Sequence, residues 1–90
     1  MLNLQRHKVF VKDVRKITFT NTQYEKYIKY LSMLLNEKPL PAGSRDHPLT
    51  GRFTGFREFH IGGDLVVIYK IEANVLQLIR LGSHSQLFSR

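Results

Sequence analysis

The stretch that decides the fold is residues 56–81, FREFHIGGDLVVIYKIEANVLQLIRL. Residues 56–61 roughly alternate apolar and polar side chains, and residues 65–71 form a nearly continuous apolar run rich in β-branched side chains. The alternation predicts a half-buried strand, and the apolar run predicts a central strand buried on both faces. Residues 75–81 predict a third strand. The polar breaks between them have hairpin length, so we expect an antiparallel meander.

An amphipathic helix is expected upstream of the meander. Phe10, Val14 and Ile17 recur at helical spacing from residue 8 onward. Basic side chains fall on another side of this helix. They are interpreted as a solvated face, or alternatively as a surface that contacts nucleic-acid phosphates. These basic residues are Lys8, Lys12, Arg15 and Lys16.

A second helix should follow, because Thr22 and Glu25 form a capping-box pattern before another run of helical period. It should end near Glu37, since Pro39 and Pro41 cannot continue a helix. Residues 2–6 alternate weakly and predict a short N-terminal edge strand. The expected fold class is therefore α+β, with two N-terminal helices packed on a small, mainly antiparallel sheet.

Length and charge limit the possible functions. Ninety residues with a net charge of +7 indicate one domain, residues 1–90, that favours polyanionic partners. Net charge is +6 in residues 1–45 and +1 in residues 46–90, so the first half resembles a docking surface. The absence of cysteine excludes a disulfide framework and a thiolate metal site. We find no secretion signal or membrane-spanning run, so we expect a soluble, cytoplasmic protein with no membrane partner.

The second half holds three of the four histidines, and the meander should gather them. His60 ends one strand and Asp64 begins the next, so one hairpin joins them. The third strand returns the chain to that edge, which brings His84 to the same rim. His47 precedes the first strand in a loop and is placed less firmly. Each histidine alone is more often an ordinary hydrogen-bonded polar residue, but three beside a carboxylate favour a functional site.

Three chemistries could use this cluster. Three imidazoles and a carboxylate suit zinc, although their spacing matches no compact metal motif. A Ser-His-Asp triad with Ser83 or Ser85 is disfavoured, because neither serine sits in a nucleophile elbow. General acid–base cleavage of RNA uses histidines to move protons at the ribose 2′-OH and the departing 5′-oxygen, and it needs no metal or other cofactor. That chemistry explains the most residues.

Motifs in fixed order across residues 46–88 resemble a known family. They are Asp-His-Pro-Leu-x-Gly at 46–51, Gly-x-Arg-Glu-x-His-Ile at 55–61, the run from 64 to 70, and Arg-x-Gly-Ser-His-x-x-Leu-Phe at 80–88. The chain resembles the YafQ-type branch of the RelE/ParE superfamily, bacterial toxins of type II toxin–antitoxin modules. The resemblance implies a ribosome-dependent endoribonuclease that cuts mRNA in the ribosomal A site and is neutralised by a small antitoxin with an acidic wrapping segment.

The resemblance also implies residue roles. Acid–base catalysis would fall to His47, His60, Asp64 and His84, leaving a 2′,3′-cyclic phosphate and a 5′-hydroxyl. Phe88 would help to position the substrate. We favour His84 as general acid, and Asp64 or His60 as base or as the residue that orients it. A non-catalytic RNA- or partner-binding relative and a metal-dependent hydrolase remain alternatives, while the histidines argue against a gyrase inhibitor.

Three further residues are candidates for substrate binding. Arg80 lies near the end of the third predicted strand and is expected to bind phosphate. Arg57 has the opposite strand parity to His60, which weakens its case. Glu58 shares the parity of His60 and either tunes a histidine pKa or is a solvated strand residue, with the second interpretation preferred. Gly82 is expected to end the strand by adopting unusual backbone angles.

Overall fold

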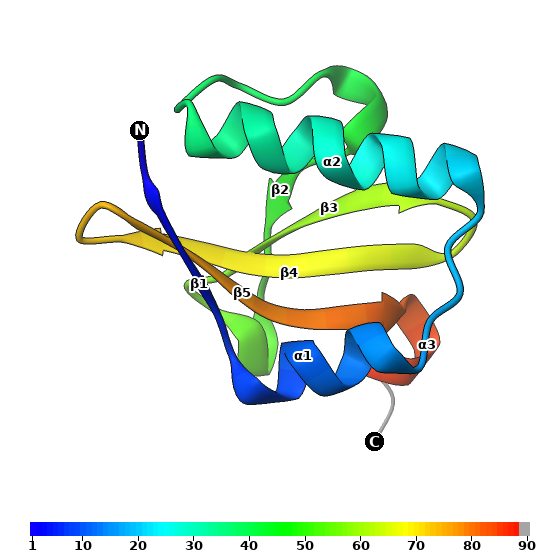
Figure 1. Ribbon diagram of the computed structural model, residues 1–90. Helices are drawn as coiled ribbons and strands as arrows, with labels where there is room; N and C mark the ends of the chain where they lie inside the picture. The colour runs from blue at the N-terminus through cyan, green and yellow to red at the C-terminus, as the bar shows by residue number, and fades with distance from the viewer. Residues whose placement is uncertain (89–90) are drawn as a thin grey trace.

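The computed structural model describes residues 1–88 and contains one five-stranded sheet with the order β1-β5-β4-β3-β2 (Figure 1). The N-terminal strand β1 runs parallel to β5, and every other neighbouring pair is antiparallel. The predicted meander and the N-terminal edge strand are both confirmed. The strands are β1 (Asn3–Arg6), β2 (His47–Pro48), β3 (Arg57–Gly62), β4 (Leu65–Glu72) and β5 (Val75–Ser83).

Two helices, α1 (Lys8–Arg15) and α2 (Asn21–Leu35), cover one face of the sheet (Figure 1). Burial of their apolar stripes against the strands forms the main core, as the helical spacing predicts. Phe10 of α1 and Phe59 of β3 are both fully buried there. The predicted α+β class, with two helices on a mainly antiparallel sheet, is confirmed. Two short 3₁₀ turns, η1 (Ala42–Ser44) and η2 (Gly51–Phe53), lie in the long loop after α2.

The start of α2 differs from the expectation. The N-cap is Thr20, whose hydroxyl accepts from the amide of Gln23, while the Gln23 side chain accepts from the amide of Thr20. This pair also satisfies the capping-box pattern, and it lies two residues before the Thr22 pattern that we preferred. The helix ends at Leu35, close to the predicted end and ahead of Pro39 and Pro41.

The opposite face of the sheet carries a second, smaller apolar cluster. Val66 and Ile68 of β4 are fully buried there under Leu87 of a third helix, α3 (His84–Phe88). We expected the strand to end at Gly82 and no helix to follow it, so α3 is an additional element. It forms because the chain folds back onto the sheet directly after β5 and buries Leu87.

Gly82 permits this return of the chain, but for a reason other than the expected one. It lies inside β5, and its φ is not in the left-handed region. A Cβ at this position would lie 3.2 Å from Leu87 Cδ2 and 3.1 Å from Gln86 Oε1. A side chain here would require these neighbours to shift by a few tenths of an ångström, so the glycine favours the close approach of α3 to the strand.

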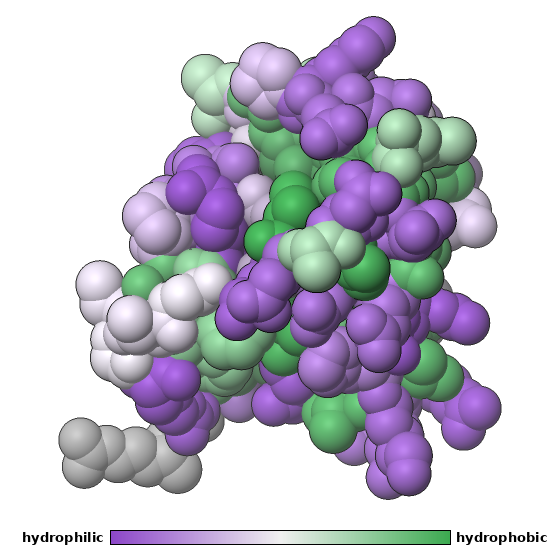
Figure 2. Space-filling model, turned by 90° about the vertical axis from the view of Figure 1, so that its left-hand side faces the viewer, coloured by the Kyte–Doolittle hydropathy of each residue, from purple (hydrophilic) through white to green (hydrophobic). Residues whose placement is uncertain are grey.

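The side of the molecule near the β4–β5 hairpin and the C-terminal end of α2 is largely hydrophilic. Figure 2 shows apolar residues there in patches interrupted by hydrophilic side chains. Among residues 1–88, no helix is both long and apolar enough to cross a bilayer.

Candidate active site

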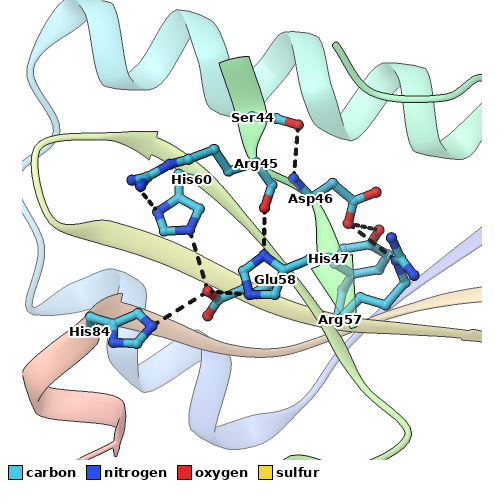
Figure 3. Close-up of polar contacts among 9 residues, drawn as sticks. Ser44, Arg45, Asp46, His47, Arg57, Glu58, His60 and His84 are labelled. Carbon is cyan, nitrogen blue, oxygen red and sulfur yellow. Dashed lines mark hydrogen bonds and ion pairs between the residues drawn. The ribbon is translucent and has the colours of Figure 1, made fainter. Parts of the chain in front are cut away.

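Three imidazole rings from three different elements converge on one buried carboxylate (Figure 3). The Oε2 atom of Glu58 lies 3.1 Å from Nε2 of His47, 3.3 Å from Nε2 of His60 and 3.4 Å from Nε2 of His84. The side chain of Glu58 is only 1% exposed, whereas those of His47 and His84 are about half exposed, at 47% and 49%. Glu58 is thus the centre of a cluster, the Glu58 cluster, that is open to solvent through two of its histidines.

Strand register explains this convergence. His47 pairs directly opposite Glu58 in the short antiparallel ladder between β2 and β3. His60 lies two residues further along β3, so its side chain is on the same face of the sheet as that of Glu58. His84 follows β5, and its amide donates to the carbonyl of Asp64 at the β3–β4 turn, 3.1 Å away.

Aromatic contacts extend the cluster into a row of rings. The ring of His60 stacks between those of His47 and His84, with centroid distances of 6.1 and 6.4 Å. His84 also stacks on Phe88 at 4.4 Å, and Phe88 meets the edge of Phe53 at 5.3 Å. Phe88, expected to help position substrate, therefore lies at the end of the histidine row with its ring part-buried.

Glu58 corrects one interpretation of the sequence. We preferred a solvated strand residue, but its carboxylate is buried on the histidine face. Neither of its oxygens receives a well-directed hydrogen bond from the part of the chain that the structure describes. The imidazole nitrogens thus lie at ion-pair distance rather than in ideal hydrogen-bond geometry. Strand parity contained this signal, because Glu58 and His60 are two residues apart in β3.

A carboxylate that is buried without strong donors can stabilise positive charge on the imidazoles around it. The histidines are not equivalent in this respect. Burial, and next the guanidinium of Arg45, hold the pKa of His60 below the usual histidine value, although the charge of Glu58 acts in the opposite direction. His60 is therefore neutral near pH 7, and its side chain is only 14% exposed. The two more exposed histidines are better placed to meet a substrate.

The structure does not bring the carboxylate of Asp64 into this cluster. Asp64 lies exposed in the β3–β4 turn, at the predicted rim, and contributes its backbone carbonyl to His84. Within residues 1–88 its carboxylate forms no hydrogen bond or ion pair. The topology places the residue near His84 as expected, but the side chain of Glu58 occupies the position that the sequence reasoning gave to Asp64.

Arg57 is directed to a different network. Its Nε donates to Oδ1 of Asp46 at 3.2 Å, and the hydroxyl of Tyr69 donates to the same oxygen at 2.6 Å. Burial raises the pKa of Tyr69 most, and the hydrogen bond to Asp46 raises it further. As its parity indicated, Arg57 does not face the Glu58 cluster (Figure 3). Asp46 instead fixes the segment that carries His47.

Arg80 is held by α1. Its Nε and Nη2 donate to the two carboxylate oxygens of Asp13 at 2.8 and 3.3 Å, and the amide of Leu81 donates to Asp13 Oδ2 at 2.9 Å. The guanidinium also lines a cavity of about 170 Å³ with Lys16. Arg80 therefore ties α1 to β5 in this structure, and its use in binding phosphate remains a prediction.

The basic residues of the first helix are exposed as expected, at Lys8, Lys12, Arg15 and Lys16. The first three belong to α1, and Lys16 is its C-cap. Helix α1 packs on the sheet face opposite the Glu58 cluster. Any contact that they make to RNA would thus be separate from the acid–base groups.

One subset of the cluster also fits a metal ion. Three possible ligand atoms lie within 4.8 Å of one another, one from each of His47, Glu58 and His60. Two imidazoles and a carboxylate are a donor set that divalent zinc or copper accepts. The sequence spacing gave only a weak signal for this arrangement, because the ligands come from two strands paired across the sheet.

Comparison with known proteins identifies the class to which this chain belongs. Residues 2–89 match the family described as "Bacterial toxin of type II toxin-antitoxin system, YafQ". The fold is thus that of a bacterial toxin. The chain belongs to the YafQ family, as the motifs in residues 46–88 indicated.

Individual relatives support this assignment. The chain is 44% identical over 63 residues to the mRNA interferase toxin YafQ of Escherichia coli strain K12, and the match covers 68% of each chain. A copper-bound mutant toxin from Helicobacter pylori has 36% identity and a TM-score of 0.86, with coverage of 98% and 100%. YafQ in the E. coli DinJ-YafQ complex has 31% identity and a TM-score of 0.84, with coverage of 99% and 100%.

Proposed function

We propose that the Glu58 cluster is the acid–base centre with which this toxin cleaves mRNA. The chain is an mRNA-cleaving toxin neutralised by an antitoxin, as its family and its curated relative named an mRNA interferase indicate. The proposal concerns the residues that perform the cleavage. One observation carries it: a single buried carboxylate oxygen lies within 3.1–3.4 Å of three imidazoles, two of them half exposed.

The reaction that this geometry suits is attack of the ribose 2′-OH on the adjacent phosphorus. A base removes the hydroxyl proton, the bond to the 5′-oxygen breaks, and an acid protonates that oxygen. The products are a 2′,3′-cyclic phosphate and a 5′-hydroxyl. Histidine suits both roles because its protonation changes near neutral pH. No metal is required for either proton transfer.

His47 and His84 are the residues that we assign to these transfers. In His47, Nδ1 contacts the carbonyl of Arg45 at 2.7 Å, so Nε2 is the nitrogen left to accept a proton. The imidazolium formed would lie 3.1 Å from the carboxylate of Glu58. His84, on the other side of the cluster, would be the general acid. Phe88 would either support the ring of His84 or stack on a nucleobase of the RNA. His60 completes the surroundings of Glu58 as a neutral ring.

Asp64 and the arginines remain candidates for contact with RNA. Asp64 has an exposed carboxylate beside the backbone of His84 and would act only once the substrate is bound. Arg57 and Arg80 each have an aspartate partner and would have to exchange it for phosphate. Arg45, exposed and next to His60, is a cation already at the cluster.

The partners would be mRNA in the ribosomal A site and the ribosome itself, with the exposed basic residues of α1 touching rRNA phosphates. Such a toxin would act in the cytoplasm. The net charge of +7 is compatible with an antitoxin that wraps the protein with an acidic segment. Binding to ribosomes should then weaken steeply as salt is added.

The test is single-turnover cleavage of a ribosome-bound message by wild type and by His47→Ala, His60→Ala and His84→Ala. The matched control is His7→Ala, because His7 is the fourth histidine and contacts Gln77 on β5, outside the cluster. We expect losses of at least about 100-fold for His47 and His84, and wild-type rates for the control. Cluster variants that cut at the wild-type rate would refute the assignment.

A further inference from the structure

Arg45 contacts two of the three cluster histidines with opposite ends of the same residue (Figure 3). Its carbonyl oxygen lies 2.7 Å from Nδ1 of His47. Its guanidinium Nη2 lies 3.1 Å from Nδ1 of His60. The sequence did not single out this residue, which is exposed and lies in a loop.

The chemistry of these contacts fixes where each ring carries its proton. A carbonyl oxygen can only accept a hydrogen bond, so Nδ1 of His47 must be the protonated nitrogen. A guanidinium can only donate, so Nδ1 of His60 must be unprotonated, and the proton of its neutral ring is on Nε2. One residue therefore imposes opposite tautomers on two neighbouring histidines.

The backbone around Arg45 is held in one conformation by hydrogen bonds. It caps the 3₁₀ turn η1 with φ 49° and ψ 40°, in the left-handed region that few residues other than glycine adopt. Its amide donates to Ala42 O at 3.0 Å. The preceding Ser44 is fully buried, and its hydroxyl donates to Pro41 O at 2.7 Å and accepts from the amide of Asp46 at 3.3 Å. A strained conformation at this position directs the carbonyl toward His47, and strain of this kind is often kept at functional sites.

We propose that Arg45 is a positioning residue for mRNA cleavage, which sets His47 as the Nδ1–H tautomer and His60 as the Nε2–H tautomer. Because Nδ1 of His47 carries the proton that is donated to the carbonyl of Arg45, Nε2 is the nitrogen that can act as a base beside Glu58. With Nδ1 of His60 covered by the guanidinium, its Nε2–H faces Glu58 at 3.3 Å. The catalytic consequence rests on the proposed function of the cluster, whereas the tautomers do not.

The experiment separates the two ends of the residue. Arg45→Gly keeps the carbonyl and tolerates the positive φ, but it removes the guanidinium. Arg45→Lys keeps a cationic donor at this position, on a shorter side chain. Lys29→Ala, which removes an exposed charge on α2, is the control. Long-range ¹H–¹⁵N spectra of the free protein report the tautomer of each imidazole, and the backbone spectrum confirms that each variant is folded.

In wild type we expect the Nδ1–H form for His47 and the Nε2–H form for His60. In Arg45→Gly the signals of His60 should move toward a mixture of tautomers while those of His47 stay, and cleavage of ribosome-bound message should fall by about 10-fold or more. Arg45→Lys should restore part of both. Unchanged His60 signals in Arg45→Gly, or an unchanged cleavage rate, would overturn the proposal. Failure of the proposed function would show differently, as full activity in the histidine variants.

Discussion

The Nε2 atom of His84 lies 3.4 Å from Oε2 of Glu58, and this contact joins the last helix of the described chain to the start of strand β3. Two elements far apart in sequence thus supply the candidate acid and the carboxylate that stabilises its charged form. The contact depends on Gly82, which leaves room for α3, and on Leu87, which is 1% exposed and packs α3 against β4. A change that weakens the packing of α3 should therefore also lower the rate of cleavage at the site.

Leu87→Ala tests that coupling. Removing a buried leucine side chain should lower the free energy of unfolding by about 2–5 kcal/mol, and the docking of α3 should weaken. Cleavage should fall as well, even at a temperature where the variant is folded, because His84 and Phe88 belong to α3. Leu4→Ala on the exposed edge strand β1 is the control and should change both quantities little. A folded Leu87→Ala protein with wild-type cleavage would contradict the coupling.

The lowered pKa of His60 makes a prediction about stability and pH. Below about pH 6.5 the unfolded chain binds a proton at this residue that the folded chain does not bind, so the free energy of unfolding falls as pH is lowered. The loss attributable to this one group cannot exceed about 1.4 kcal/mol per pH unit. Urea unfolding between about pH 8 and about pH 5.5 should show a larger loss for wild type than for His60→Gln. Equal losses in the two proteins would be the contrary result.

Asp13 should matter for stability rather than for proton transfer. Its carboxylate accepts from Arg80 and from the amide of Leu81 and is only 8% exposed as a residue. Asp13→Asn should lower the free energy of unfolding by about 1–3 kcal/mol, because the hydrogen bonds between α1 and β5 lose the carboxylate charge and one acceptor oxygen. Asp64→Asn is the matched control, since that carboxylate has no partner within residues 1–88, and its stability should be that of wild type. Equal stability of all three proteins would contradict this role for Asp13.

Metal ions should inhibit rather than activate. His47, Glu58 and His60 suit zinc or copper, and an ion there would occupy the Nε2 atom that we assign as base. Added Cu²⁺ should bind to the free protein with an affinity that falls in His60→Ala and not in His7→Ala. It should also slow cleavage. A chelator selective for zinc and copper over magnesium, which leaves ribosomes intact, should not reduce activity. Loss of activity with that chelator, restored by added zinc or copper, would favour a metal-dependent hydrolase.

Most of the fold could be predicted from the sequence because local signals agreed with one another. The β-branched run of β4 and the short turns around it determine the meander, and helical spacing around Phe10 determines α1. The misjudged parts depend on tertiary contacts. α3 is only five residues long and forms where Leu87 finds a buried position. β2 has only two residues, and Pro48 within it gives no strand signal.

The site was predicted in outline for the same reason. Hairpin topology brings His60 and His84 to one rim, and no long-range information is needed for that step. Whether a given carboxylate at the rim faces inward depends on register, and here Glu58 faces the histidines while Asp64 faces solvent. Arg45 was missed because its role depends on a left-handed backbone conformation, which composition and periodicity do not reveal.

The central claim is that the charge of Glu58 supports proton transfer by the histidines around it. The most direct measurement is the single-turnover rate at which Glu58→Gln cleaves a ribosome-bound message, with the ends of the fragments identified. Glutamine keeps the shape of the side chain and removes its charge. We predict a folded protein that cleaves at least about 100-fold more slowly than wild type. The fragments made by wild type should end in a 2′,3′-cyclic phosphate and a 5′-hydroxyl. A Glu58→Gln protein that cleaves at the wild-type rate would contradict the account.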